Sequence, residues 1–163
     1  MAFDAYLKIE GIPGESTDDK HKDWIEVLSF SWGVHQPKSV ASTAGSRSSE
    51  RADFKDFSIT KLIDKASPKL AIACATGEVF KTALFELCRA GGDKVKYMEY
   101  KFSDVMITSY EPVGHTTGNE LPKEQVEMTY GKVELKYTST DPSTGKAKGD
   151  VAAGWDLKAN KKV

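Results

Sequence analysis

The sequence predicts a mainly β fold: a bent antiparallel sheet that curls towards a small barrel, with one short α-helix. Three observations predict it. Apolar and polar residues alternate along most of the chain, which is the period of a strand. The phase of this alternation changes repeatedly, as it does at the β-bulges that bend sheets. Only the segment from Ser67 to Gly77 carries the signals of a helix. The 163 residues suffice for one core, so we expect a single domain over residues 1–163.

Two strands are predicted near the N-terminus. The first runs from Phe3 to Ile9, where every second residue is apolar. The second runs from Trp24 to Val34, and the changing phase of its apolar positions predicts a bulge or burial on both faces. A period of two places large apolar side chains of this strand in the core, namely Leu28, Phe30 and Trp32. The opposite face then carries small residues, namely Ser29, Ser31 and Gly33.

A long polar segment follows, from Gln36 to Ala52. It is rich in serine, and Val40 is its only sizeable aliphatic residue. It is too polar to be buried and long for a connection inside a compact domain, so we expect either a functional loop or a disordered one. A strand-like pattern resumes from Phe54 to Ile63.

The one predicted helix begins at Ser67-Pro68 and ends before Gly77. Serine suits the N-cap and proline suits the first helical position. Glycine suits the position that follows the last turn. Leu70, Ala73 and Cys74 share one helical face, so we expect that face to pack against the sheet.

The remaining chain is predicted to consist of strands and turns. Alternation from Ala83 to Leu87 puts Glu86 and Cys88 on the face opposite the apolar residues. Gly91-Gly92-Asp93 is typical of a tight hairpin turn. After this turn we expect a long strand or bent pair over Lys94 to Tyr110 and a loop over Pro112 to Leu121. Strands are expected around Val126 and Val133, with an irregularity at Tyr130-Gly131 between them. The chain is then expected to form a loop over Asp141 to Asp150, a short strand at Trp155 and Leu157, and a basic tail over residues 158–163.

Charge and cysteine content exclude several classes of protein. The net charge is −1 and the pI is near 6.3, which argues against nucleic acid as the main partner. Cys74 and Cys88 lack zinc or redox spacing, so we expect two reduced thiols. The N-terminus lacks the features of a signal peptide, and no segment approaches the roughly 20 apolar residues of a membrane span. We therefore expect a cytoplasmic protein without membrane insertion, which leaves the cell only through a dedicated machine.

Motifs for catalysis or cofactor binding are missing from the sequence. It contains no G-x-S-x-G, H-E-x-x-H or G-x-G-x-x-G motif and no phosphate-binding loop. His21, His35 and His115 are far apart and lack the spacing of metal ligands. We expect no catalytic residue, no cofactor and no metal, and a structural or interaction protein rather than an enzyme. Two other classes stay open: a monomeric β-barrel that binds a small ligand in its interior, and an enzyme with an unrecognised site.

An ordered series of short matches along the whole chain resembles the hemolysin-coregulated protein (Hcp) family. No single match is chemically diagnostic, but the series is specific. The matching segments are Met1-Ala2-Phe3-Asp4 with Lys8-Ile9, Gly14-Glu15-Ser16, Ile25 to Gly33, Thr60-Lys61, Ile63-Asp64-Lys65, Ser67-Pro68 with Leu70, Ala90-Gly91-Gly92, and Gly154-Trp155-Asp156-Leu157 with Asn160.

The resemblance implies a small antiparallel β-barrel of two sheets with one helix beside it. Six copies of such a subunit form a ring with a wide channel, and the rings stack into the inner tube of the bacterial type VI secretion system. A contractile sheath propels this tube, which carries a spike protein at its tip, and the lumen holds small effector proteins. The tube is secreted without a signal peptide. Toxin domains follow the barrel in some relatives, and the end of this chain soon after Asn160 implies none here.

Two sets of candidate residues follow from combining the pattern with the resemblance. Ser29 and Ser31 are candidates for the channel wall, where small side chains would leave a smooth, weakly polar surface. The polar segment is the candidate for contact with the next ring, and its residues of interest are Lys38, Ser39, Val40, Ser42 and Arg47. We expect a closed head-to-tail ring of six copies.

Overall fold

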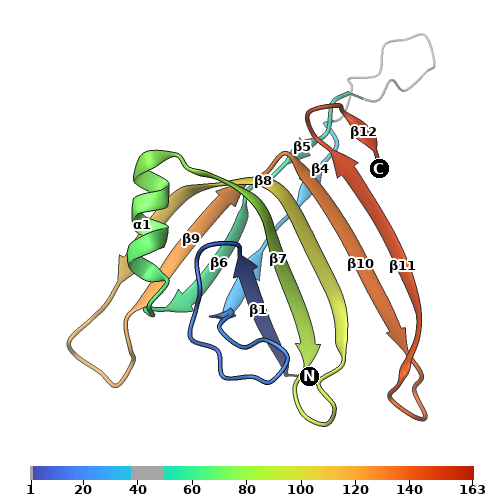
Figure 1. Cartoon of the computed structure of the whole chain (residues 1–163), viewed down its shortest axis with the longest axis horizontal. Coiled ribbons are helices and arrows are strands. Elements are labelled where there is room, and N and C mark those ends of the chain that lie inside the picture. Colours follow the sequence, from blue (N-terminus) through green and yellow to red (C-terminus); the bar gives the residue numbers. More distant parts are fainter. Residues whose placement is uncertain (1, 38–49) are drawn as a thin grey trace.

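The computed structural model describes residues 2–37 and 50–163, and most of these residues lie in strands (Figure 1). The helix α1 spans Ser67–Thr76. The strands are β1 (Phe3–Ile9), β2 (Ile25–Val27), β3 (Ser29–Ser31), β4 (Val34–His35), β5 (Asp53–Phe54), β6 (Phe57–Leu62), β7 (Val79–Arg89), β8 (Lys96–Val113), β9 (Lys123–Thr129), β10 (Lys132–Thr140), β11 (Ala147–Asp156) and β12 (Lys161–Lys162). They form a ten-stranded and a two-stranded antiparallel sheet, which confirms the predicted fold class.

The long strand β8 organises the larger sheet. Along one side it pairs with β7. Along the other side its first part pairs with β10 and its second part with β9. The ladder breaks where Asp104 adopts a φ of 53° and the Gly131 amide donates to the Ser103 carbonyl at 2.9 Å. The irregularity predicted at Tyr130-Gly131 is this break. From it the sheet divides into a β10–β11–β12 branch and a β9–β6–β3 branch.

The segment predicted as one strand from Trp24 to Val34 is three short strands. β2 pairs with β1, whereas β3 pairs with β6, so the chain changes partner at Leu28. The predicted burial of Leu28 is wrong: its side chain is 50% exposed, because the backbone amide turns to the Thr60 carbonyl at 2.8 Å. Phe30 and Trp32 are half-buried against the core, as expected. This crossing curls the sheet around the core, and the ladder is interrupted at Leu28.

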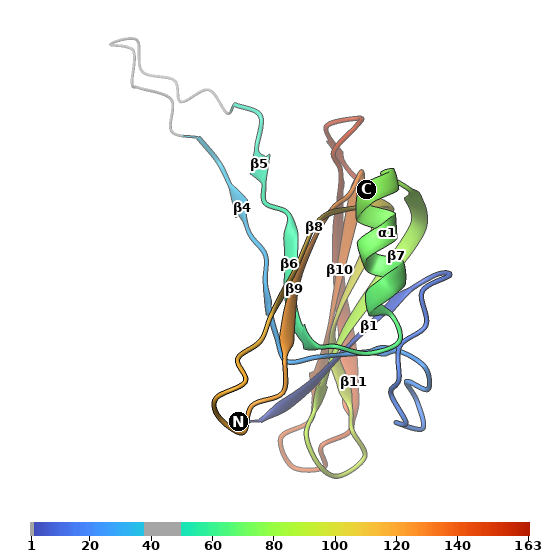
Figure 2. The same cartoon turned by 90° about the vertical axis from the view of Figure 1, so that its left-hand side faces the viewer.

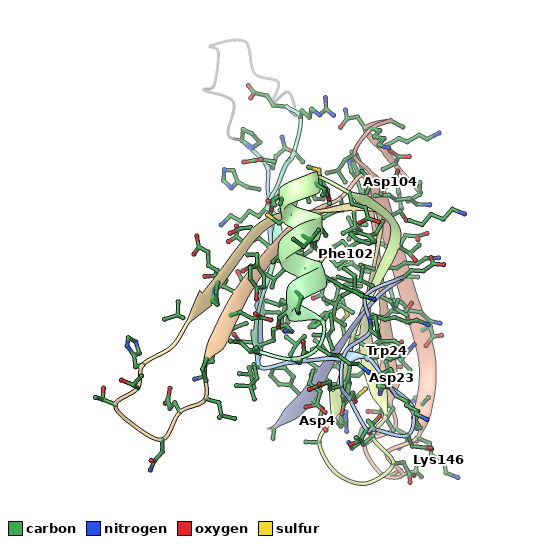
Figure 3. The ribbon with its side chains drawn as sticks, turned by 60° about the vertical axis from the view of Figure 1, so that its left-hand side comes forward. Asp4, Asp23, Trp24, Phe102, Asp104 and Lys146 are labelled. Carbon is green, nitrogen blue, oxygen red and sulfur yellow. The ribbon has the colours of Figure 1, made fainter. Side chains whose placement is uncertain are left out.

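Aromatic side chains fill the space that the curled sheet encloses. The ring of Phe57 lies 4.9 Å from that of Phe85 and 4.8 Å from that of Phe102, centroid to centroid. All three are fully buried. Tyr100 and Phe30 pack against them. In Figure 3 the helix lies in front of the labelled Phe102, on one side of this core.

Helix α1 begins one residue earlier than predicted. Ala66 is the N-cap and no side chain caps it; Ser67 is the first helical residue. The helix ends as predicted before Gly77, whose φ of 68° is the left-handed conformation that glycine favours. Leu70 and Ala73 are buried and Cys74 is half-buried, so the predicted packing face is confirmed. No helix in the described ranges is long and apolar enough to cross a membrane.

Three further boundaries differ from the prediction. The segment read as a loop from Asp141 to Asp150 enters strand β11 at Ala147, and the residues read as a basic tail include strand β12. β8 also extends through Val113, two residues into the expected loop. The hairpin predicted at Gly91-Gly92-Asp93 joins β7 to β8, but its connection spans residues 90–95 and is longer than the tight turn expected. The β10–β11 hairpin lies at one side of the molecule (Figure 1), and β4 and β5 lead away from its body (Figure 2).

Candidate functional site

The two predicted channel residues lie on an exposed sheet face. Ser29 and Ser31 project from β3 and are exposed, on the side opposite the core. Their partners on β6 are Thr60 and Ser58 respectively, so four hydroxyl side chains lie beside one another. We call this surface the serine face and define it by its members on three strands: Ser29, Ser31, Ser58, Thr60, Gln125 and Glu127.

Strand β9 completes the serine face. Gln125 pairs with Thr60, and Glu127 pairs with Ser58. The Gln125 amide nitrogen donates to the Ser58 hydroxyl at 3.2 Å, across the strand pair. The surface therefore combines four short hydroxyl side chains with the longer Gln125 and Glu127, and it carries hydrogen-bonding groups without a large apolar residue among its members.

Sequence reasoning missed four of these six residues, although a signal for two was present. Ser58 and Thr60 alternate with Phe57 and Ile59, which are buried, so period two alone assigns them to the outer face. Which strand lies beside β3 is a matter of long-range pairing, and the local sequence does not carry that information.

Polar contacts at one end fix the strand that carries the serine face. The Trp32 indole donates to the Tyr130 hydroxyl, which in turn donates to the Lys55 carbonyl at 2.8 Å. Burial raises the pKa of Tyr130 to about 12. These bonds join the end of β3 to the β9–β10 connection and to the start of β6.

A buried ion pair lies beneath β6 and β9. Lys61 contacts Glu124, and the Ser67 hydroxyl donates to the same carboxylate at 2.6 Å. Tyr110 donates to its other oxygen at 2.5 Å. Burial raises the pKa of Glu124, but hydrogen bonds from Lys61, Ser67 and Tyr110 outweigh it and hold that pKa below its usual range. The Ser67 hydroxyl, predicted to cap α1, instead joins the helix to β9.

The inner face of the β10–β11 hairpin continues the apolar side of the core beyond the body. Val133 on β10 is fully buried, and Leu135 is half-buried. Two residues further, Tyr137 is 47% exposed, and its partner Val151 on β11 is 71% exposed. Over the described residues, the outer edge of β11 is paired only at Trp155 and Asp156, by β12. An apolar face and a free strand edge therefore lie side by side on this hairpin.

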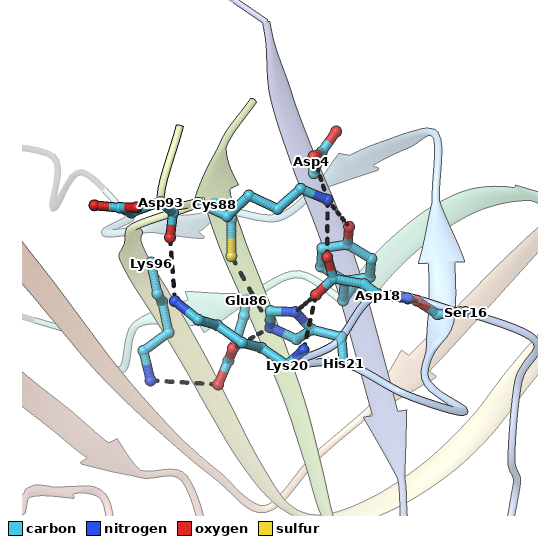
Figure 4. A network of polar contacts seen from close by, with 11 residues as sticks. Asp4, Ser16, Asp18, Lys20, His21, Glu86, Cys88, Asp93 and Lys96 are labelled. Atoms are coloured by element: carbon cyan, nitrogen blue, oxygen red, sulfur yellow. Dashed lines mark hydrogen bonds and ion pairs between the residues drawn. The ribbon is translucent and has the colours of Figure 1, made fainter. Parts of the chain in front are cut away.

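A cluster of charged side chains surrounds His21, to which the sequence alone assigned no functional role. Its Nδ1 lies 2.7 Å from Asp18 and its Nε2 lies 2.7 Å from Glu86 (Figure 4). Lys94 donates to Asp18 at 2.8 Å. Hydrogen bonds from Lys94 and then His21 lower the pKa of Asp18 to about 2, and the bond to Asp18 raises the pKa of Lys94. The cluster fastens the loop before β2 onto the outer face of β7.

The five candidates for contact between rings, Lys38, Ser39, Val40, Ser42 and Arg47, lie outside the described residues. The structure places only the flanking strands β4 and β5, which pair with each other at the base of this segment. The two cysteines are both free, and Cys88 is buried beside His21.

Comparison with known proteins gives concordant matches. A family model described as "Type VI secretion system effector, Hcp" matches residues 6–137. The chain is 32% identical over 161 residues to protein hcp1 of Pseudomonas aeruginosa, covering 98% of each chain. It is similar to the solved structure of a type six secretion system protein, with a TM-score of 0.94, 40% identity, and coverage of 99% of this chain and 100% of that one. Hcp1 from Salmonella typhimurium gives a TM-score of 0.82 and 34% identity at the same coverage.

Proposed function

The chain belongs to the Hcp family of type VI secretion system proteins, and from this we propose that it is a structural subunit of the system's inner tube. Six copies form a head-to-tail ring, rings stack, and the lumen carries small effector proteins during export. The contractile sheath and the spike protein are its other partners. We infer that it assembles in the cytoplasm and is secreted to the medium or a target cell, and that it has no enzymatic activity.

The observation that carries the assembly is the uncovered apolar face of the β10–β11 hairpin. Tyr137 and Val151 extend the core side of the sheet, yet within the described residues no element of the same chain covers them. An apolar surface next to a free strand edge favours association, because it buries apolar area and pairs backbone groups together. A neighbouring copy of this chain supplies that cover when the ring closes.

We expect Val151→Asp to prevent ring formation while the subunit stays folded. Val151 is 71% exposed in the isolated chain, so a carboxylate there costs little in the monomer but opposes burial at an interface. Size-exclusion chromatography with light scattering should show a six-fold species for the wild type and a monomer for the variant. Val151→Ile is the matched control and should keep the hexamer. A hexameric Val151→Asp protein would show that this hairpin lies outside the interface.

The serine face supports the carrier role. It lies on the side of the sheet opposite the core and is polar throughout, with four short hydroxyl side chains, which suits the wall of a channel that accepts varied cargo. Its role in the lumen stays a prediction, as does the role of the segment from Gln36 to Ala52 in stacking.

We expect Ser31→Gln to weaken cargo retention without affecting the fold or the hexamer. Ser31 is exposed and makes no core contact, while glutamine adds bulk to the channel wall. The measurement is the amount of a cognate effector that co-purifies with the hexamer. Lys69→Gln, on the exposed side of α1, is the control for an added amide elsewhere. Loss of the hexamer would place Ser31 in an interface, and unchanged retention would remove the support for a lumen role.

The rival function, binding of a small ligand inside a monomeric barrel, has less support. The interior that such a ligand would occupy is filled by Phe57, Phe85 and Phe102. A clean monomer for the wild-type protein in the chromatography experiment would favour this rival.

A further inference from the structure

Three side chains with metal-binding chemistry converge on the outer face of β7. His21 Nε2 lies 2.7 Å from Glu86 Oε2 and 3.9 Å from Cys88 Sγ (Figure 4). One donor atom from each residue lies within 4.8 Å of the other two, and all three residues are buried. Within the described residues, this is the one group of His, Cys and acidic side chains that meets this criterion.

The donor set and its dimensions suit a tetrahedral ion of the zinc type. Imidazole nitrogen, thiolate sulfur and carboxylate oxygen are the ligands of zinc in proteins. With metal–ligand distances of about 2.0–2.3 Å, tetrahedral donors lie roughly 3.3–3.6 Å apart. The observed separations of 2.7 Å and 3.9 Å lie on either side of this range. Metal binding therefore requires the Glu86 carboxylate to move away from His21 Nε2 and the Cys88 sulfur to move towards it, within a group whose donor atoms all lie within 4.8 Å of one another.

The surroundings orient the imidazole as they do in metal sites. Asp18 accepts a hydrogen bond at Nδ1, which leaves Nε2 directed at Glu86 and Cys88. A carboxylate on the far nitrogen of a ligating histidine is the usual second-layer contact. The Tyr6 ring stacks on the imidazole at 4.2 Å, and Trp24 meets it edge-on at 4.7 Å, so the ring plane is fixed.

The backbone brings the ligands together from two segments, strand β7 and the loop before β2. Glu86 and Cys88 alternate on β7 and point to the same face, as the sequence pattern predicted. His21 comes from the loop before β2, which is closed by a backbone bond from the Gly14 amide to the Asp23 carbonyl at 2.8 Å. A side chain on Gly14 would meet the Trp24 carbonyl oxygen at 2.3 Å, so the close approach of these loop arms requires glycine.

Negatively and positively charged side chains both surround the cluster, and together they set the electrostatic potential at the proposed ion position. Carboxylates come from Asp4, Asp18, Glu86 and Glu99, and ammonium groups come from Lys20, Lys94 and Lys96. Lys96 binds Glu86 Oε1 at 3.3 Å, so the other oxygen stays directed at His21. The lysines that remain are paired with Asp18, Asp4 and a backbone carbonyl rather than with the three donor atoms.

We propose that His21, Glu86 and Cys88 form a binding site for a zinc-type divalent ion, with one coordination position left for water. On binding, two protons pass to solvent: that of the Cys88 thiol, whose sulfur then bonds the metal as a thiolate, and the one held in the hydrogen bond between His21 Nε2 and Glu86 Oε2. The hydrogen bond between His21 and Glu86 gives way to two bonds to the ion. The ion then joins the loop before β2 to strand β7, independently of the role of the chain in a tube.

The test is a titration of the purified protein with Co²⁺ under reducing conditions, in whatever oligomeric state it adopts. Thiolate coordination gives a near-ultraviolet charge-transfer band, and a tetrahedral site gives intense visible bands. We expect both at one Co²⁺ per subunit, displaced by Zn²⁺. Cys88→Ala should lose the charge-transfer band, while Cys74→Ala, which removes the other thiol, should keep it. Asp18→Asn should weaken binding by about 10–100-fold, as removal of such second-layer contacts does.

Cys88→Ala is the decisive variant because alanine fits a small buried position without leaving a buried charge unpaired. Circular dichroism and urea unfolding confirm that it folds. If the wild type shows no charge-transfer band, or if Cys88→Ala keeps the band of the wild type, the proposal is overturned. Neither result depends on effector binding or on ring assembly. A negative result would therefore overturn the metal site without affecting the proposed tube function, and loss of the tube function would leave the metal site untouched.

Discussion

Replacing Lys61 by alanine is expected to destabilise the subunit by about 3–5 kcal/mol, the usual cost of leaving a buried charge without its partner. Lys61 and Glu124 are 0% and 1% exposed, so neither charge is hydrated. Without the ammonium group, Glu124 retains only the hydroxyl donors of Ser67 and Tyr110. The free energy of unfolding is measured by urea denaturation at fixed subunit concentration, because assembly also stabilises the fold.

A double-mutant cycle separates the pair from its surroundings. Lys61→Met combined with Glu124→Leu removes both charges and should cost less than the sum of the single changes. The ion pair Lys123–Glu120 is the exposed control, and Lys123→Ala should cost under about 1 kcal/mol. If Lys61→Ala and Lys123→Ala lowered the free energy of unfolding equally, water would be able to solvate Glu124 in place of Lys61 at little cost.

Phe57→Ala is expected to cost about 3–5 kcal/mol, as large aromatic deletions in cores do. The Phe57 ring is fully buried and lies within packing distance of four other aromatic rings, so its removal leaves a cavity in the centre of the core. Denaturant unfolding measures the loss. Phe3→Ala is the matched control, because Phe3 is 42% exposed and touches the core only at its edge. A similar cost for both would show that the core closes around the missing ring.

The local alternation of apolar and polar residues was sufficient to predict the strands that pack one face against the core. Every second residue is apolar from Phe3 to Ile9 and from Ala83 to Leu87, and the strands β1 and β7 that this pattern predicts are confirmed. It failed at Leu28, where the chain changes partner, because partner choice depends on residues far along the chain. It failed also at Ala147, where β11 lies beyond the core and therefore lacks an apolar alternation to detect.

The candidate sites show the same division. Exposure of Ser29 and Ser31 follows from period two, and the structure confirms it. The cluster at His21 joins residues of a loop and of a strand that are 65 positions apart, so no spacing in the sequence signals it. The predicted helix cap at Ser67 was wrong for a related reason, since a distant carboxylate, Glu124, competes for the same hydroxyl.

The position of β1 between β2 and β7 has a consequence for how the chain folds during synthesis. The first strand pairs on one side with β7, and its Phe3 lies opposite Arg89. This half of the sheet therefore cannot form until the middle of the chain has been synthesised. At about 5–20 residues per second on a ribosome, β1 spends on the order of several seconds without that partner. Non-local pairing of this kind also slows folding itself, to roughly milliseconds or seconds. A strand that lacks its β7 partner for this long is a natural target for chaperones. During that time chaperones can keep incomplete subunits apart.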